Sequence, residues 1–346
     1  MGGWLTSDFA SILIAGFVVG IVVGLTGMGG GALMTPALIF LGVGGASTVV
    51  TADLTAAAIS RSAGALTHAR HGSPNLRLAI WLIVGSVPAA LVGPWVIHGL
   101  AGGSPATVDR VLMECIGFAL LFAATTYALR IYLNLRRTHG HREPADPDPP
   151  IRPGVTLLVG ALGGLLVGIT SVGAGSVIMI ALLMLHPGLP PVRLVGTDLV
   201  QAVPLVLAAA VSNIAINGLD WHILVPLVIG STPGTVLGSR IAPRVPQSYI
   251  RRGIVIVLTM SGVALLDKSG WAPLGAGKDD THPMVVAGVG VAMVVLVPLV
   301  WGLIRRTEGL PMFGAPTVAQ LEGGPAERRT PDDEAADDGS PTSGTS

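Results

Sequence analysis

Charged and polar side chains interrupt the apolar stretches of this 346-residue sequence, and they are its first candidates for chemistry. Arg61 lies about 14 residues into a stretch that starts near Ser47. A charge at that depth of a bilayer costs about 2.5 to 3.5 kcal/mol, so it is a functional candidate by default. The guanidinium fork suits the oxygens of an anion. A structural ion pair with Asp53, two helical turns away, is the alternative.

Two acidic residues lie at matching depths in two stretches. Asp53 and Asp198 each lie about a third of the way into an apolar stretch. A carboxylate there can exchange a proton or pair with a cation, and it can equally cap a nearby broken helix. Gln201, near Asp198, is a candidate substrate ligand. We expect His68 and Asn213 to have a coupling or structural role, and His68, near the end of its stretch, also suits a solvated histidine.

Two glycine-rich runs are the most informative feature of the chain. They divide residues 9–41 and 154–186, each of which would reach about 50 Å as a straight helix against a bilayer core of about 30 Å. Broken helices expose backbone N–H groups and helix dipoles that can hold an anion. The alternative is that these glycines only allow close helix crossing. The predicted binding residues in the runs are Thr26, Gly27, Met28, Gly29, Thr170, Ser171, Val172 and Gly173.

The chain repeats itself. The run that starts at Gly24 matches the run that starts at Gly168 at an offset of 144 residues. Two further blocks match at an offset of 145, and these are Ala52-Asp53-Leu54 with Thr197-Asp198-Leu199 and Gly85-Ser86-Val87-Pro88 with Gly230-Ser231-Thr232-Pro233. The order of three blocks in near-constant register indicates a duplication. We therefore expect two transmembrane repeats, residues 1–135 and 154–267, joined by an Arg- and Pro-containing linker at 136–153.

Composition places most of the chain in a membrane. Hydrophobic residues make up 51% and charged residues 12%, and the mean hydropathy is +0.71. A net charge of zero offers no basic surface for nucleic acid. The single cysteine, Cys115, excludes an internal disulfide and a multi-cysteine metal site. We predict apolar segments at 9–41, 47–69, 77–100, 111–134, 154–186, 194–216, 221–239, 250–267 and 283–304.

The positions of the arginines favour one topology. Basic residues mark the cytoplasmic side of short loops. They share one side only if 9–41 and 154–186 are re-entrant, each a pair of half-helices that returns to its starting side. The fold class is then an all-α polytopic membrane protein with two inverted repeats, each holding a broken half-helix pair and three spanning helices. Residues 268–304 add a loop and an extra span, and 305–346 form a disordered cytoplasmic tail.

The sequence resembles a known transporter family at these same positions. The run Gly20-Ile21-Val22-Val23-Gly24-Leu25-Thr26-Gly27-Met28-Gly29-Gly30-Gly31, its second copy and the paired Gly-Ser-x-Pro-x4-Gly blocks are similar to the sulfite exporter TauE/SafE family. The resemblance covers roughly residues 9–267. It implies a bacterial inner-membrane protein with a duplicated unit that moves sulfite, sulfonates or related sulfur-containing organic anions. The extra span and the polar tail depart from the commonest short form of the family.

These observations together predict a secondary transporter of a small anion that works by alternating access. An anion channel and a non-transport membrane scaffold are the alternatives. We expect no enzyme, since no Gly-x-Ser-x-Gly elbow surrounds the serines of the spans, and no cofactor or metal. The expected partners are the small anion, the lipid bilayer and a coupling proton or sodium ion, with homo-oligomerisation left open and no nucleic acid. The expected location is the bacterial inner membrane, with the N-terminus outside and the C-terminus cytoplasmic.

Overall fold

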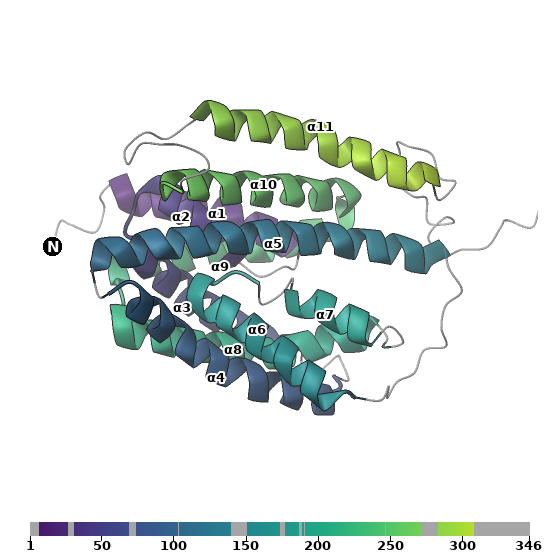
Figure 1. Ribbon diagram of the computed structural model, residues 1–346, viewed down its shortest axis with the longest axis horizontal. Coiled ribbons are helices and arrows are strands. Elements are labelled where there is room, and N and C mark those ends of the chain that lie inside the picture. Colours follow the sequence, from purple (N-terminus) through teal and green to yellow (C-terminus); the bar gives the residue numbers. More distant parts are fainter. Residues whose placement is uncertain are drawn as a thin grey trace, which may run out of the picture.

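The structure is a computed structural model, and its described part is all-helical (Figure 1). It describes residues 7–26, 31–68, 74–102, 104–139, 151–173, 177–186, 189, 191–245, 247–271 and 283–307. These residues form eleven α-helices and one short 3-10 helix, and none of them is in a β-strand. The predicted all-α class is confirmed. The predicted linker and tail lie largely outside the described residues.

The helices follow one another with short connections. Their bounds are α1 Ser7–Thr26, α2 Gly31–Leu41, α3 Ala46–His68, α4 Leu76–Leu100, α5 Pro105–His139, α6 Pro153–Thr170, α7 Val177–Leu185, α8 Pro191–Asn217, α9 Trp221–Ile241, η1 Ala242–Arg244, α10 Gln247–Lys268 and α11 Pro283–Thr307. Helix α5 continues past the predicted span to His139, into the predicted linker.

Six of the described helices are long and apolar enough to cross a membrane. They are α1, α4, α5, α6, α8 and α9, each with an apolar stretch of at least 18 residues. Because an apolar helix of that length matches the bilayer core, the chain is a multi-pass membrane protein. Many large apolar side chains point outward on these helices, among them Leu162 and Trp95, as lipid-facing residues do. Helix α3 contains Asp53 and Arg61 and is less apolar than α1.

Both long apolar segments are divided into two helices at their glycines, as predicted. The first divides between Thr26 and Gly31, and the second between Thr170 and Val177. At the second break the backbone turns because Ser171 adopts φ 60° and Gly173 adopts φ 110°. Few side chains tolerate that left-handed region, which glycine enters freely. The inverted relation between the two halves stays a prediction.

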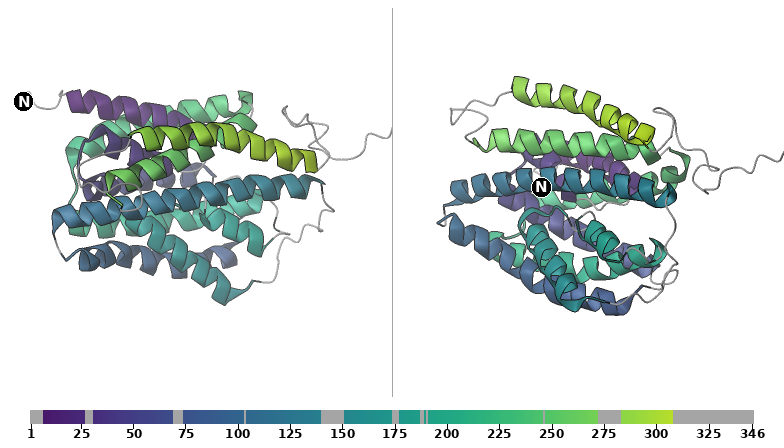
Figure 2. Two further views of the ribbon diagram at one scale, coloured as in Figure 1. Left: turned by 45° about the horizontal axis from the view of Figure 1, so that its top comes forward. Right: turned by 45° about the vertical axis from the view of Figure 1, so that its right-hand side comes forward.

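Helix α1 packs closely along α9 (Figures 1 and 2), and glycines of each helix contact the backbone of the other. A Cβ atom on Gly20 would lie 2.6 Å from the carbonyl oxygen of Ser231, so the two backbones touch. Gly16 and Gly24 of α1 and Gly230, Gly234 and Gly238 of α9 make equivalent backbone contacts along the same seam. Glycines four residues apart on both helices let backbones approach in lipid, where no hydrophobic force drives association.

A second pair, α4 and α6, packs in the same way. A Cβ atom on Gly160 would lie 2.6 Å from the carbonyl oxygen of Leu82, and one on Gly168 would lie 2.5 Å from that of Ala90. Gly160 and Gly168 are the repeat mates of Gly16 and Gly24 at the offset of 144. The pairing therefore crosses between the predicted halves, because α1 contacts a helix of the second half and α6 contacts a helix of the first.

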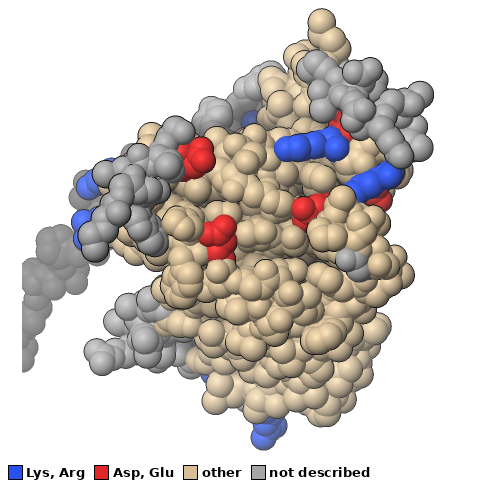
Figure 3. Space-filling view, turned by 90° about the vertical axis from the view of Figure 1, so that its left-hand side faces the viewer, with Lys and Arg blue, Asp and Glu red and all other residues tan. Residues whose placement is uncertain are grey.

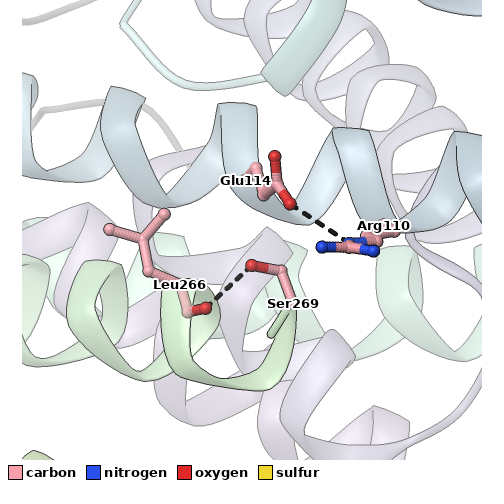
Figure 4. Close-up of polar contacts among 4 residues, drawn as sticks. All are labelled: Arg110, Glu114, Leu266 and Ser269. Atoms are coloured by element: carbon pink, nitrogen blue, oxygen red, sulfur yellow. Dashed lines mark hydrogen bonds and ion pairs between the residues drawn. The ribbon is translucent and has the colours of Figure 1, made fainter. Parts of the chain in front are cut away.

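The acidic residues near the helix ends gather at one end of the bundle, together with Arg110 and Lys268, and most of the described arginines lie at the other. The acidic residues Asp109, Asp220 and Asp267 lie at one end, where Ser47 of α3 donates to Asp109 and Lys268 donates to the carbonyl of Ile39. Figure 3 shows this end, where separate acidic groups and a few basic groups lie on a mostly uncharged surface. Figure 4 shows two local contacts near it, the Arg110–Glu114 ion pair of 3.3 Å and the Ser269–Leu266 bond. The described arginines at the opposite ends of their helices include Arg77, Arg152, Arg193, Arg240, Arg244 and Arg306.

The close contacts at Gly20 of α1 and Gly160 of α6 predict that a side chain at either position destabilises the fold. Gly20→Ala and Gly160→Ala place a methyl group against backbone that cannot move aside, so each should destabilise the fold by about 1–3 kcal/mol. Gly288→Ala is the matched control, because a Cβ atom there meets nothing within 4 Å and alanine favours helix. Thermal unfolding in detergent measures the effect. Equal melting temperatures for all three variants would contradict the close packing.

Candidate functional site

A buried carboxylate lies where the two broken segments meet. Asp53 of α3 is 2% exposed. Its Oδ2 atom accepts a hydrogen bond of 2.6 Å from Thr35 Oγ1 and one of 2.8 Å from Ser171 Oγ. Thr35 belongs to α2, the second helix of the first broken segment, and Ser171 follows α6 in the second broken segment. One carboxylate therefore joins three parts of the chain that are up to 136 positions apart.

The break after α6 is built from local hydrogen bonds. Ser171 caps α6 in the left-handed conformation, and its N–H donates to the carbonyl of Val167. The Thr170 hydroxyl donates to the carbonyl of Leu166 at 2.6 Å and accepts from the N–H of Val172 at 3.1 Å. Thr170 and Val172 thus hold the shape of the break in this conformation. Gly173 needs its positive φ, so any side chain at this position strains the backbone whether or not a ligand is bound.

The first broken segment touches the second directly. Gly31, the first residue of α2, packs against the backbone and hydroxyl of Ser171 so closely that a Cβ atom would overlap the Ser171 carbonyl oxygen. The start of α2 and the end of α6 therefore share one contact point beside Asp53. Since the N-terminus of a helix carries a partial positive charge, the start of α2 adds an anion-attracting group there.

Arg61 lies two turns beyond Asp53 on α3 and is partly exposed. It interacts electrostatically with Asp198 and with Asp53. Among the described side chains, Asp53 is bonded to hydroxyls, and no ion pair joins it to Arg61. Ser60, the residue before Arg61, is exposed although α3 packs between α8, α9 and α5. The Arg61 guanidinium therefore interacts electrostatically with the carboxylates of Asp53 and Asp198, and it forms no ion pair with Asp53 among the described contacts.

Asp198 forms a second buried polar group on α8. It is 7% exposed, and its Oδ1 atom accepts a bond of 3.0 Å from Gln201 Nε2. The Oε1 atom of Gln201 is buried and has no hydrogen-bond partner among the described residues. The neighbouring Thr197 hydroxyl accepts from the N–H of Asn75, which caps α4. Sequence reasoning placed Asp198 and Gln201 together, and the structure brings them into contact.

Asn213 of α8 forms a hydrogen bond with α6, the first helix of the second broken segment. Its Nδ2 atom donates to the carbonyls of Gly168 and Ala209, both at 2.9 Å. Asn217, one turn later, donates to the Thr51 hydroxyl of α3 at 3.3 Å and to Asn213 Oδ1 at 3.4 Å. These bonds place Asn213 beside the last turn of α6, where it supports the position of the break.

Several predicted site residues fall outside the described part of the chain. Gly27, Met28 and Gly29 lie outside the described residues, as does the side chain of His68 near the end of α3. Thr26 closes α1, and its hydroxyl donates to the carbonyl of Val23 at 3.2 Å.

The sequence reasoning missed two groups of polar residues. Thr35 lies in an apolar run beside Pro36 and has Met179 as its repeat mate, so neither composition nor the repeat singled it out. Thr51 and Asn217 were also missed. The sequence signal for Thr51 was its position two residues before Asp53. The signal for Asn217 was its position one helical turn after Asn213, which places both side chains on the same face of the helix.

Comparison with known proteins identifies the family to which this chain belongs. The sulfite exporter TauE/SafE family matches residues 12–265. The chain belongs to this family of membrane transporters. It is 34% identical over 259 residues to the "Probable membrane transporter protein YjnA" of Bacillus subtilis (strain 168), covering 74% of this chain and 99% of the relative.

Two more distant relatives match the chain over a similar length. The "Probable membrane transporter protein YdhB" of Bacillus subtilis (strain 168) is 25% identical over 74% of this chain and 99% of its own length. A "Probable membrane transporter protein" of Xylella fastidiosa (strain 9a5c) is 27% identical over 76% of this chain and 96% of its own length. No solved structure matches the chain. The matched region ends before α11, so the last helix lies beyond the shared core.

The hydrogen bonds of Asp53 predict that the hydroxyls of Thr35 and Ser171 stabilise the folded protein. Thr35→Val and Ser171→Ala each remove one hydroxyl donor from a buried carboxylate, so each should lower the free energy of unfolding by about 1–3 kcal/mol. Ser60→Ala is the matched control, because its exposed hydroxyl bonds only within its own helix. Thermal unfolding at neutral pH measures the three variants. If the first two melt like Ser60→Ala, the hydroxyls do not support Asp53.

Proposed function

We propose that this TauE/SafE protein is a secondary transporter that moves a small anion, such as sulfite, a sulfonate or a related sulfur-containing organic anion, across the inner membrane by alternating access. The observation that carries the proposal is the contact between the two broken segments at Asp53, with Arg61 nearby. Secondary transporters build substrate sites from discontinuous helices at such junctions. The substrate class is taken from the family description, which names sulfite.

The proposed substrate site combines a cation with backbone donors. Arg61 supplies a planar fork for the oxygens of the anion, and the starts of α2 and α7 supply N–H groups and helix dipoles. The proposed ligands are Arg61, Gln201 and the residues of the breaks, Thr26, Gly27, Met28, Gly29, Thr170, Ser171, Val172 and Gly173. Asp53, Asp198, His68 and Asn213 have the proposed coupling or structural role.

The crossed helix pairs supply the moving parts of the proposed mechanism. The backbones of α1 and α9 touch along three glycines on each helix, and those of α4 and α6 touch along two glycines of α4 and three of α6. Such close packing resists deformation, so each pair is expected to move as a unit. The broken segments meet between the two units at Gly31 and Ser171. Rocking of one unit against the other would open the site to each side in turn.

Most of the described arginines lie at one end of the helices, and this distribution supports a cytoplasmic location for that end. Short loops that carry arginine stay on the cytoplasmic side. With that end inside, the start of α1 lies outside and the end of α11 lies in the cytoplasm, in agreement with the orientation expected from the sequence.

The orientation is testable with a single cysteine in residues 136–153, introduced into a Cys115→Ser background. Because this segment is expected on the cytoplasmic side, a membrane-impermeant maleimide should label it only after the cells are opened. A cysteine in place of Ala106, near the acidic end of α5, is the control that should react in intact cells. Labelling of the linker cysteine in intact cells would overturn the orientation.

The role of Arg61 is tested by transport of labelled sulfite into proteoliposomes. Arg61→Ala should weaken the apparent affinity about 10- to 100-fold, and Arg61→Lys should weaken it less, because lysine keeps the charge but loses the fork. Arg110→Ala is the control, since Arg110 pairs with Glu114 at the outer end. Uptake that rises linearly with concentration would indicate a channel instead. Full recovery of transport in Arg61→Ala/Asp53→Asn would show that Arg61 only balances Asp53.

A further inference from the structure

The hydrogen bonds of Asp53 are unevenly divided between its two oxygens. Thr35 and Ser171 both donate to Oδ2, at 2.6 and 2.8 Å. Within the described part of the chain, no hydrogen bond reaches Oδ1. A proton can therefore bind Oδ1 while Oδ2, then a carbonyl oxygen, keeps both hydroxyl donors. The carboxyl group can be ionised or neutral in this site without loss of its contacts.

The charges around Asp53 favour neutralisation when an anion binds. The group that acts on Asp53 directly is Arg61 of its own helix, and Asp198 of α8 acts on the same guanidinium. Helix α2 and the described residues of the break contribute hydroxyls and no charge, while Asp109 of α5 bonds Ser47 at the start of α3. Two carboxylates and one guanidinium carry one net negative charge when all are ionised. An anion that joins them is repelled unless a carboxylate takes up a proton.

From this geometry we infer that Asp53 is the site of proton coupling, at which one proton binds together with the transported anion. The inference rests on the proposed anion transport and names its coupling ion. Coupling between two ligands is reciprocal, so the proton strengthens anion binding as much as the anion strengthens proton binding. Because Thr35 and Ser171 come from the two broken segments, a change at Asp53 acts directly on both.

A sodium ion fits the observed geometry less well. The hydroxyls of Thr35 and Ser171 point their hydrogens at Oδ2 at ordinary hydrogen-bond distances. A cation would need the lone pairs of these oxygens instead, so both hydroxyls would have to turn away from the carboxylate. The proton requires no such rearrangement.

The proton site is tested first without any anion. Infrared difference spectra between alkaline and acidic pH should contain a C=O stretching band of a protonated, buried carboxyl group. Asp53→Asn should lose this band, while Asp109→Asn, which removes a carboxyl at the outer end, should keep it. The Asn side chain resembles the protonated acid and still accepts from both hydroxyls, so this variant is expected to fold.

A second measurement uses the wild-type protein, in case Asp53→Asn does not fold. Dicyclohexylcarbodiimide reacts with protonated carboxyl groups in apolar surroundings. Mass spectrometry should find its adduct on Asp53, with labelling that increases as the pH falls. A band that persists in Asp53→Asn, or an Asp53 that is never labelled, would overturn the proton site whatever the transport assays show.

Coupling is then tested with isethionate, whose sulfonate stays ionised throughout the pH range, in proteoliposomes. Wild-type net uptake should increase at least about fivefold when the outside is made acidic, and should not depend on sodium. Asp53→Asn should lose this stimulation but keep isethionate exchange at equal pH on both sides. Uptake driven by sodium, or still stimulated by acid in Asp53→Asn, would overturn the inference. Absence of any saturable sulfite or isethionate flux in wild type would instead refute the proposed function, and the coupling role of Asp53 with it.

Discussion

The absence of water inside a bilayer is the constraint on which this structure depends. A broken helix at membrane depth leaves backbone groups without their helical partners, and each group must find another within the protein. Here Ser171 and Thr170 satisfy the end of α6 locally, and Asn213 reaches the Gly168 carbonyl from α8. Asp53 is held by two hydroxyls in the same way. The break is therefore held by hydrogen bonds from hydroxyl and amide groups of the protein itself.

The close helix contacts at the glycines position the polar residues around Asp53. Helix α6 reaches its position beside α4 because Gly160 and Gly168 let the backbones touch, and this places Ser171 over Asp53. Bulkier residues would hold α6 away by the width of a side chain and would break the hydrogen bond. The glycines of the spans and the hydroxyls of the break are therefore parts of one arrangement. The close-crossing role of glycine, posed at first as an alternative to a binding role, operates along the spans, whereas Gly173 has a conformational role in the break.

The sequence predicted the elements of the fold better than their partners. Length and hydropathy placed the spans, and the glycine runs located both helix breaks, because these features are local. The repeat identified Asp53 and Asp198 as mates. The crossed pairing of α1 with α9 and α4 with α6 could not be predicted, since all four helices carry glycines four or eight residues apart and several pairings satisfy that spacing. Thr35 was missed because a threonine in an apolar run bonds its own helix as readily as a distant carboxylate.

The predicted duplication does not make the surroundings of Asp53 symmetric, and this difference bears on the proposed mechanism. The repeat mates of Arg61, Ser171 and Thr35 are Val206, Gly27 and Met179, so each of these three groups occurs in one copy only, Arg61 and Thr35 in the first and Ser171 in the second. Val206 and Met179 are buried apolar residues. The two helix pairs, each formed between the halves, pack alike, so two conformations of the proposed transport cycle can have similar packing energies. The unique groups around Asp53 then give the single site its charge and its hydrogen bonds, because two identical sites facing each other would double the charge that must be buried.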